Sequence, residues 1–251
     1  MTKTRMTVLI ALLVLASSPS VFGDEAILVV APKGATAWTA QMTDLAAKVN
    51  AQTAAEVVFG VPTRAAIAEG VERLAKRGAT GIVVVPFFLS EPVAPDSLKG
   101  FSVPVRLGTA AANAPGLTDA ILARAATISA APANELLVVV GYSSNDAGAS
   151  WVMDLGPSGR RLNAARRFAS VLLLGILDTM SETEAQQMRR VLERHVDAGQ
   201  RILVVPMVGG ATGTAGIPSH SVFKGFSIAT ASDGAIGDDH VMDWLLTLTS
   251  R

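Results

Sequence analysis

The sequence predicts an α/β fold made of two flavodoxin-like, doubly wound parallel-sheet domains with a cleft between them. Apolar runs of strand length alternate with amphipathic helical patterns, which is typical of parallel sheets covered on both faces. The same order of elements then occurs a second time, with Val30 corresponding to Val140 and Leu117 to Val241. A repeated order at a nearly constant offset indicates internal duplication.

The first copy begins with an apolar strand and closes with a helix. Pro62-Thr63 opens its second helix, and Gly78 suits the position just past the end of that helix. The expected elements are strands over 27–31, 56–59, 81–89 and 102–106, and helices over 36–50, from residue 63, and over 117–128.

The second copy repeats this order. Ser181 and Glu184 form a capping box that opens its second helix. The periodicity of its first helix is expected to turn Leu162, Ala165 and Phe168 inward. The expected elements are strands over 136–140, 171–177, 202–208 and 226–229, and helices over 160–169, from residue 181 to Gly199, and over 240–248.

The N-terminus carries a three-part secretory pattern. Lys3 and Arg5 form a short basic region, residues 7–16 are apolar, and residues 17–23 are small. We therefore expect a signal peptide over residues 1–23, although an uncleaved anchor is the alternative. The protein is then exported to the periplasm or secreted, with no stable membrane span after cleavage.

The rest of the chain divides at the Ala/Pro-rich stretch 130–133, giving an N-terminal domain over 24–131 and a C-terminal domain over 132–251. Two fused halves can replace a homodimer, so we expect a monomer or a weak oligomer.

Composition excludes several classes of function. The chain has 251 residues, with 21 Lys+Arg against 21 Asp+Glu, and this balance argues against a nucleic-acid partner. It has no cysteine, which excludes disulfides, thiolate metal sites and a cysteine nucleophile. The Gly-rich stretch 209–216 matches neither nucleotide-binding glycine motif, so we expect no nucleotide. This stretch is either an anion-binding backbone nest around Gly210 or a flexible loop.

The segment 60–90 (GVPTRAAIAEGVERLAKRGATGIVVVPFFLS) resembles the core of the CbiX/SirB sirohydrochlorin chelatases, and residues 195–208 are similar but looser. This resemblance implies insertion of Co²⁺ or Fe²⁺ into a tetrapyrrole bound in the cleft, without ATP. It also implies metal-binding histidines in loops after the strands, one of them in a G-H-G-S motif.

The sequence departs from the family pattern where that chemistry lies. The G-H-G-S position reads Pro32-Lys33-Gly34-Ala35 in the first copy and Gly141-Tyr142-Ser143-Ser144 in the second. Lysine and neutral tyrosine are poor ligands for these metals, whereas histidine serves both as ligand and as base near neutral pH. The sequence therefore keeps the strand and helix pattern of the family better than it keeps the metal-binding histidines.

Three residues remain candidates for metal binding: His220, Glu91 and His240. His220 and Glu91 lie in loops after apolar strands and are the candidate catalytic residues, acting as ligand or base. His240 stands beside Asp238 and Asp239. The alternatives are a surface-loop histidine, a polar loop residue and a helix cap.

The candidate ligand-binding residues follow the first strand of each copy or line the glycine-rich loop. Lys33 could pair with the acidic side chains of a tetrapyrrole; the alternative is an ordinary loop residue. These candidates are Lys33, Tyr142, Ser143 and Gly210.

Two functions remain open. One is an exported CbiX-like metal chelatase. The other is a periplasmic protein that binds a tetrapyrrole or a metal without turnover. The sequence does not decide whether the protein is an enzyme.

Overall fold

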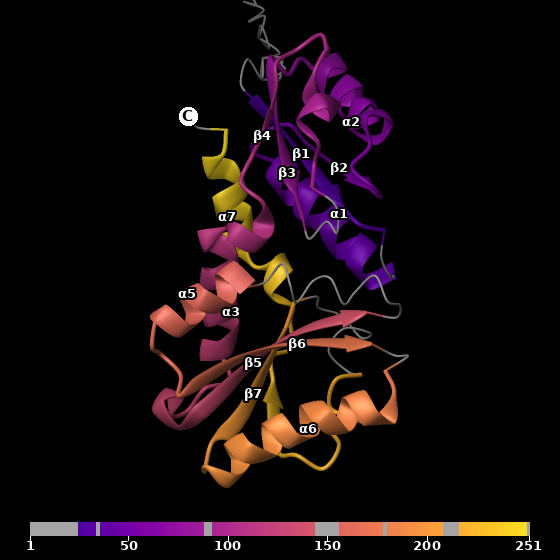
Figure 1. Ribbon diagram of the computed structural model, residues 1–251. Coiled ribbons are helices and arrows are strands. Elements are labelled where there is room, and N and C mark those ends of the chain that lie inside the picture. The colour runs from indigo at the N-terminus through magenta and orange to yellow at the C-terminus, as the bar shows by residue number, and fades with distance from the viewer. Residues whose placement is uncertain are drawn as a thin grey trace, which may run out of the picture.

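The computed structural model describes residues 25–33, 36–87, 92–143, 156–177, 180–207 and 216–249. Within these ranges lie two four-stranded parallel sheets, with strand orders β2-β1-β3-β4 and β6-β5-β7-β8. Figure 1 shows one sheet above the other, with helices on their faces. The predicted class, two doubly wound α/β units related by duplication, is confirmed. The predicted signal peptide lies outside the described residues.

The element order repeats as expected. The first sheet contains β1 (Glu25–Ala31), β2 (Ala55–Phe59), β3 (Gly81–Pro86) and β4 (Val105–Leu107). The second contains β5 (Glu135–Ser143), β6 (Ser170–Leu177), β7 (Arg201–Pro206) and β8 (Ile228–Thr230). The helices are α1 (Thr36–Asn50), α2 (Arg64–Lys76), α3 (Pro115–Ala126), α5 (Gly156–Ala164), α6 (Glu182–Asp197) and α7 (Asp239–Thr247).

Each central strand supplies side chains to two cores, because successive residues of a strand point to opposite faces. Ile27 and Val29 of β1 pack with α1, while Leu28 and Val30 pack with α2. The central strand β5 repeats this pattern, with one face toward α3 and the other toward α6. Continuous apolar strands are therefore required here, as the sequence indicated.

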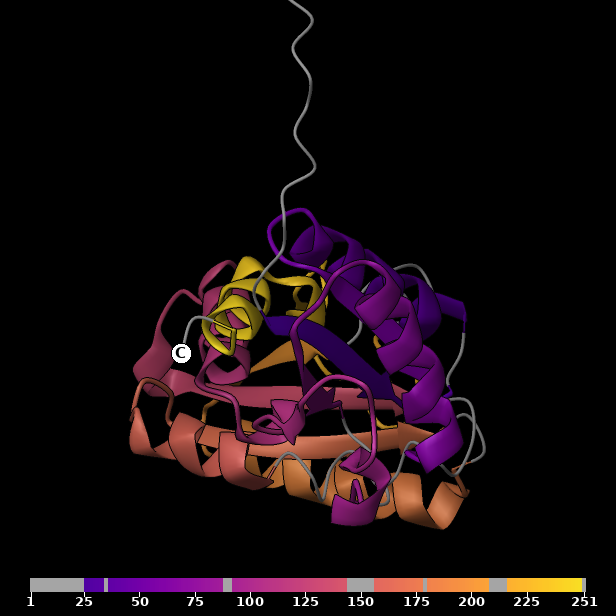
Figure 2. The same cartoon turned by 90° about the horizontal axis from the view of Figure 1, so that it is seen from above.

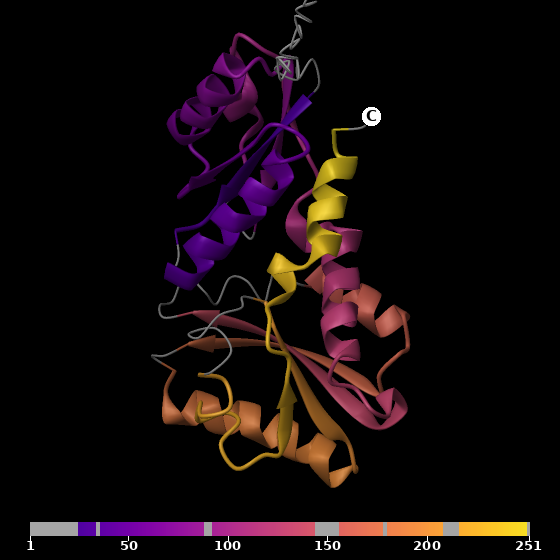
Figure 3. The same ribbon diagram turned by 180° about the vertical axis from the view of Figure 1, so that it is seen from behind.

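The last helix of each half covers the other half. The Trp244 ring on α7 lies 6.1 Å from the ring of Phe87, just after β3. On α3, Ile121 belongs to the same core cluster as Val205 of β7. Figures 1 and 3 show α7 beside the first sheet and α3 beside the second. The two halves therefore share one apolar core.

The helices α3 and α7, each of which covers the other half, are called the exchanged helices. An arginine–glutamate pair binds the end of each of them. Arg106 binds Glu25, with 2.7 Å between Nε and Oε1, and donates to the carbonyl of Leu248 just after α7. Arg201 binds Glu135, with 3.2 Å between Nη1 and Oε1, and donates to the carbonyl of Ile128 just after α3. The duplication thus extends to the joints between the halves.

The helix predicted over 160–169 was misplaced. It spans Gly156–Ala164, and Pro157 suits its first turn because the missing N–H has no helical partner there. Arg166 adopts a left-handed φ of 47°, beyond the end of this helix. Phe168 packs against the core as expected, whereas Ala165 is exposed.

The predicted caps are confirmed. The Thr63 side chain accepts a hydrogen bond from the N–H of Ala66, and Ser181 and Glu184 form the reciprocal capping box. None of the helices in the described ranges combines the length and apolarity that crossing a bilayer requires.

Candidate functional site

The carboxyl ends of β3 and β7 point toward the region where the two halves meet, as Figure 1 shows. The view from above in Figure 2 shows the first half lying over the second. The N–H of Ile236 donates to the carbonyl of Met207 just after β7, and next to it a Cβ atom on Gly237 would lie 2.7 Å from Nε2 of Gln41 on α1. The strand ends where α/β proteins bind ligands therefore converge on the junction.

Lys33 lies at the carboxyl end of the first sheet, two residues after β1, and is exposed. Its side chain extends over Gly60 at the end of β2, where a Cβ atom would lie 3.8 Å from Cε of Lys33. The N–H of Gly60 donates to the carbonyl of Ala31, which holds the two strand ends together. Among the described residues, Lys33 has no ion pair, so its ammonium can meet an anionic ligand.

The strand register shows which residue of the second half corresponds to Lys33, and it differs by one residue from the motif alignment. Val30 pairs with Pro86 and Val140 pairs with Pro206, so Val30 and Val140 are equivalent. Counting three residues onward makes Ser143 the counterpart of Lys33. Aligning the motifs had paired Lys33 with Tyr142. The strand was predicted to end at residue 140, whereas β5 continues to Ser143, so Tyr142 and Ser143 belong to the carboxyl end of the strand and not to the loop after it. Glu91 and Gly210 lie outside the described residues.

His220 lies in a turn that packs against α6. The turn buries Ile217 and Phe223 in the core beneath α6, and Arg189 of α6 donates to the carbonyl of Ser221 at 3.0 Å. Nδ1 of His220 accepts a hydrogen bond from the N–H of Val222 at 3.3 Å. This half-buried imidazole therefore contributes to the shape of its own turn.

His240 lies in the first turn of α7 and pairs with the capping residue Asp238, with 2.6 Å between Nδ1 and Oδ1. The hydrogen bond to Asp238 raises the pKa of His240, desolvation opposes this, and the charges of Asp238, Asp119 and Asp243 add to it. Arg124 of α3 places Nε 3.1 Å from the other oxygen of Asp238. The carboxylate of Asp238 therefore caps α7 and also binds the imidazole of His240 and the guanidinium of Arg124.

The structure does not bring these histidines together. The turn of His220 packs on the α6 face of the second sheet, whereas α7, which begins beside His240, packs into the core on the opposite face. His195 is on α6, paired with Gln200 at 2.9 Å, away from the junction. Within the described ranges, no three His, Asp or Glu side chains form a group that could hold a metal. The metal roles of His220, Glu91 and His240 stay predictions.

A cavity of about 520 Å³ lies between the halves. Ala37, Ala40 and Gln41 of α1 line it from the first half, and Asp233 and Gly234 line it from the second. Its charged groups are paired: Asp44 with Lys48 at 3.4 Å, and Asp233 with Arg124 at 3.4 Å. The sequence predicted a cleft between the halves, but no local pattern identifies the residues that line it.

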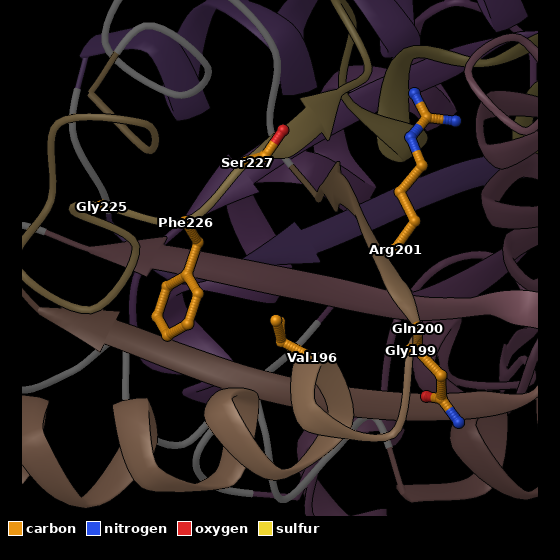
Figure 4. Close-up of a pocket in the computed structure, with 7 residues that line it drawn as sticks. All are labelled: Val196, Gly199, Gln200, Arg201, Gly225, Phe226 and Ser227. Carbon is orange, nitrogen blue, oxygen red and sulfur yellow. The ribbon is translucent and has the colours of Figure 1, made fainter.

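A groove of about 390 Å³ lies at the opposite, amino edge of the second sheet, between the end of α6 and the chain leading to β8. Figure 4 shows Val196 and Phe226 in this groove, with the Arg201 side chain directed away from both. The sequence did not predict this groove, because Val196 follows the apolar periodicity of α6 and yet is 43% exposed. Its distance from the carboxyl ends separates it from the predicted ligand site.

Comparison with known proteins agrees with this architecture. Residues 28–98 match the CbiX family. No curated protein matches the chain in sequence. The structure of SirB from Bacillus subtilis with Fe³⁺ has a TM-score of 0.61 and 20% identity, covering 90% of this chain and 94% of that one. The cobalt complex of the sirohydrochlorin chelatase SirB from Bacillus subtilis subspecies spizizenii has a TM-score of 0.59 and 19% identity, with the same coverage.

A third similar structure is longer. DR2241 from Deinococcus radiodurans, a multi-domain protein with structural similarity to chelatases, has a TM-score of 0.60 and 16% identity. The alignment covers 91% of this chain but only 55% of DR2241, so this chain spans about half of that protein. The chain therefore shares the fold of these chelatase structures over nearly its whole length, and residues 28–98 of its N-terminal half match the CbiX family.

Proposed function

We propose that this chain is an exported protein that binds a tetrapyrrole between its halves, at the carboxyl ends of the two sheets. The main support for this proposal is Lys33, whose exposed ammonium lies at the end of β1 within the segment that matches CbiX. Sirohydrochlorin-type macrocycles carry carboxylates, and an ammonium without an ion-pair partner among the described residues suits them.

Metal insertion is the second candidate. It is supported by the CbiX match and by the similarity to SirB, which has been solved with Fe³⁺ and with cobalt. Co²⁺ or Fe²⁺ would then be a substrate. The positions of the histidines favour binding over insertion, because His220 and His240 are engaged in local hydrogen bonds with Val222 and Asp238 and belong to elements on opposite faces of the second sheet.

Binding is tested by titrating purified protein with sirohydrochlorin and following its absorbance. We expect saturable binding that Lys33→Ala weakens about five- to tenfold, as for the loss of one charge pair. Lys76→Ala is the matched control, because this exposed lysine ends α2 just before β3 begins, at the amino edge of the first sheet. Unchanged affinity in Lys33→Ala, or no binding at all, contradicts the proposal.

Insertion is tested by adding Co²⁺ or Fe²⁺ to the same complex. Binding without acceleration over the spontaneous reaction supports a binding protein. Acceleration that His220→Ala abolishes supports a chelatase with a displaced ligand. Export is tested separately, by N-terminal sequencing of the protein from the periplasmic fraction, where residue 24 is expected first.

A further inference from the structure

The outer edge of the second sheet is long, apolar and open. β6 runs for eight residues, SVLLLGIL, and is hydrogen-bonded on one side to β5. Among the described residues, no strand pairs with its other side. At about 3.3 Å per residue this edge is about 26 Å long. Val171, Leu172 and Leu173 are only half-buried along it. Such an edge is a template for pairing with another strand.

The other three sheet edges are protected. β4 and β8 have three residues each, too short for extended pairing. β2 carries Glu56, which pairs with Arg73 at 3.2 Å and with Arg77 at 3.2 Å. Short strands and charged side chains both discourage edge pairing. β6 differs from β4 and β8 in its length and from β2 in containing no charged residue.

Charges of opposite sign flank the two ends of β6. Arg166 and Arg167 precede it, Glu182 and Glu184 follow it at the start of α6, and all four are exposed. No ion pair engages either arginine within the described ranges. In an antiparallel pair of β6 strands related by a two-fold axis near Leu174, the arginines of each copy lie beside the glutamates of the other. The edge is therefore complementary to itself.

We propose that β6 pairs antiparallel with β6 of a second copy of this chain, joining two second sheets into one continuous sheet. Because the two copies are related by a two-fold axis, each arginine–glutamate pair occurs twice in this contact. The carboxyl ends of the two joined sheets then point in opposite directions, so each copy keeps its own ligand region. The contact depends on one strand and its flanking charges, which makes a weak, concentration-dependent dimer the expected state.

Sedimentation equilibrium tests the proposal on the full chain and on residues 24–251, over about 1 to 100 µM protein. We expect a monomer–dimer equilibrium that Leu172→Lys shifts to monomer. Leu172 is half-buried at the edge, and lysine can keep its charge in water while its stem covers apolar surface. Val61→Lys is the control, because Val61 is 57% exposed just after β2 on the other sheet. A chain that stays monomeric throughout overturns the proposal.

A charge exchange tests the orientation without altering the strand. Arg167→Glu and Glu182→Arg should each weaken the dimer about tenfold, since each places two like-charge pairs in the contact. The double variant should restore the affinity. Two weakened single variants with no restoration exclude the antiparallel two-fold arrangement.

Hydrogen exchange gives a result that does not depend on any variant. Amides within 171–176 should gain protection as protein concentration rises, whereas amides of β2 should not. Concentration-independent protection that disappears when residues 1–23 are removed would instead mean that the N-terminal segment covers β6. Protection confined to another surface assigns the dimer to that surface, and either result overturns the proposal.

Discussion

The two halves use the same joint but bury it to different depths. Glu25 and Glu135 each begin a central strand, and each binds the arginine that holds the end of an exchanged helix. The side chain of Glu25 is 28% exposed, and its arginine comes from β4. That of Glu135 is 1% exposed, and its arginine begins β7. Both halves therefore contain the same arginine–glutamate contact, but the two contacts should contribute different amounts to the free energy of unfolding.

Glu135 has more partners because it also organises the linker between the halves. The N–H groups of Ala130 and Ala131 donate to it at 2.9 and 3.2 Å, and the Ser129 hydroxyl donates as well. Burial alone would raise the pKa of Glu135, but the hydrogen bonds from Ala130, Ser129, Ala131 and Arg201 outweigh it and lower that pKa. For Glu25, the hydrogen bond from Arg106 is the main cause of a lowered pKa, against the opposing effect of burial.

The largest difference between the halves should appear on deleting these carboxylates. Glu135→Ala removes a buried carboxylate that accepts hydrogen bonds from Ser129, Ala130, Ala131 and Arg201, and should lower the free energy of unfolding by about 2–4 kcal/mol. Glu25→Ala should lower it by about 1 kcal/mol or less, since that pair is partly solvated. Urea unfolding of both variants measures the two values, and equal losses would contradict the comparison.

Acid should reveal the same asymmetry. A carboxylate whose folded pKa lies below its ordinary value of 4.5 contributes stability above that value, and the contribution is lost as pH falls through the folded pKa. The unfolding free energy of the wild type should therefore fall more steeply below pH 4.5 than that of Glu135→Ala.

The crossing of the exchanged helices should tolerate no added volume. A Cβ atom on Gly116 of α3 would lie 2.5 Å from Cβ of Trp244 on α7, beside the backbone of His240. Gly116→Ala should therefore lower stability by about 1–3 kcal/mol. Gly156→Ala at the start of α5 is the control, because its nearest atom would be a flexible arginine nitrogen at 3.7 Å. Similar melting temperatures for the two variants would disprove a tight crossing.

The equivalent helices α2 and α6 should differ modestly in their dependence on their caps. Ser181→Ala removes a reciprocal capping box and should lower stability by about 1 kcal/mol. Thr63→Ala removes a single hydrogen bond of 3.3 Å and should have a smaller effect. Thermal unfolding of the two variants ranks them, and a larger loss for Thr63→Ala would reverse the expected order.

The smallest effect should come from His240. Its folded pKa is raised above 6.5, so its contribution is complete below pH 6.5 and is lost as pH rises through the folded pKa. His240→Gln should therefore lower stability at pH 5.5 by less than about 1 kcal/mol, because the ring is 52% exposed, and by less still at pH 8.5. A larger loss at alkaline pH would contradict this assignment.

Sequence periodicity predicted the elements but could not assign helices to sheets. The apolar runs gave the strand order along the chain, and Thr63 and Ser181 marked two helix starts. The pattern of α7 showed an apolar face, but nothing in it distinguishes the core of its own half from that of the other. Helix α5 was displaced because Ser158 and Gly159 are weak helix formers, whereas in the fold Ser158 donates to the carbonyl of Ala112.

The candidate site was predictable only where a strand fixes it. The position of Lys33 at a strand end was predictable because β1 is an unambiguous apolar run, whereas the motif alignment shifted its counterpart by one residue from the equivalence of Val30 and Val140. His220 and His240 have similar sequence contexts, each in or after a loop. Their separation onto opposite faces of one sheet depends on where α6 and α7 pack, which no local pattern encodes.

The exchange of α3 and α7 has a consequence for biosynthesis. Trp244 and Leu248, which contact the first half, are synthesised long after the strands of the first sheet. The first half therefore keeps an apolar surface uncovered until α7 has been made, however early its own strands assemble. A nascent chain stalled before α7 should consequently bind chaperones through its N-terminal half, and release should follow once α7 emerges.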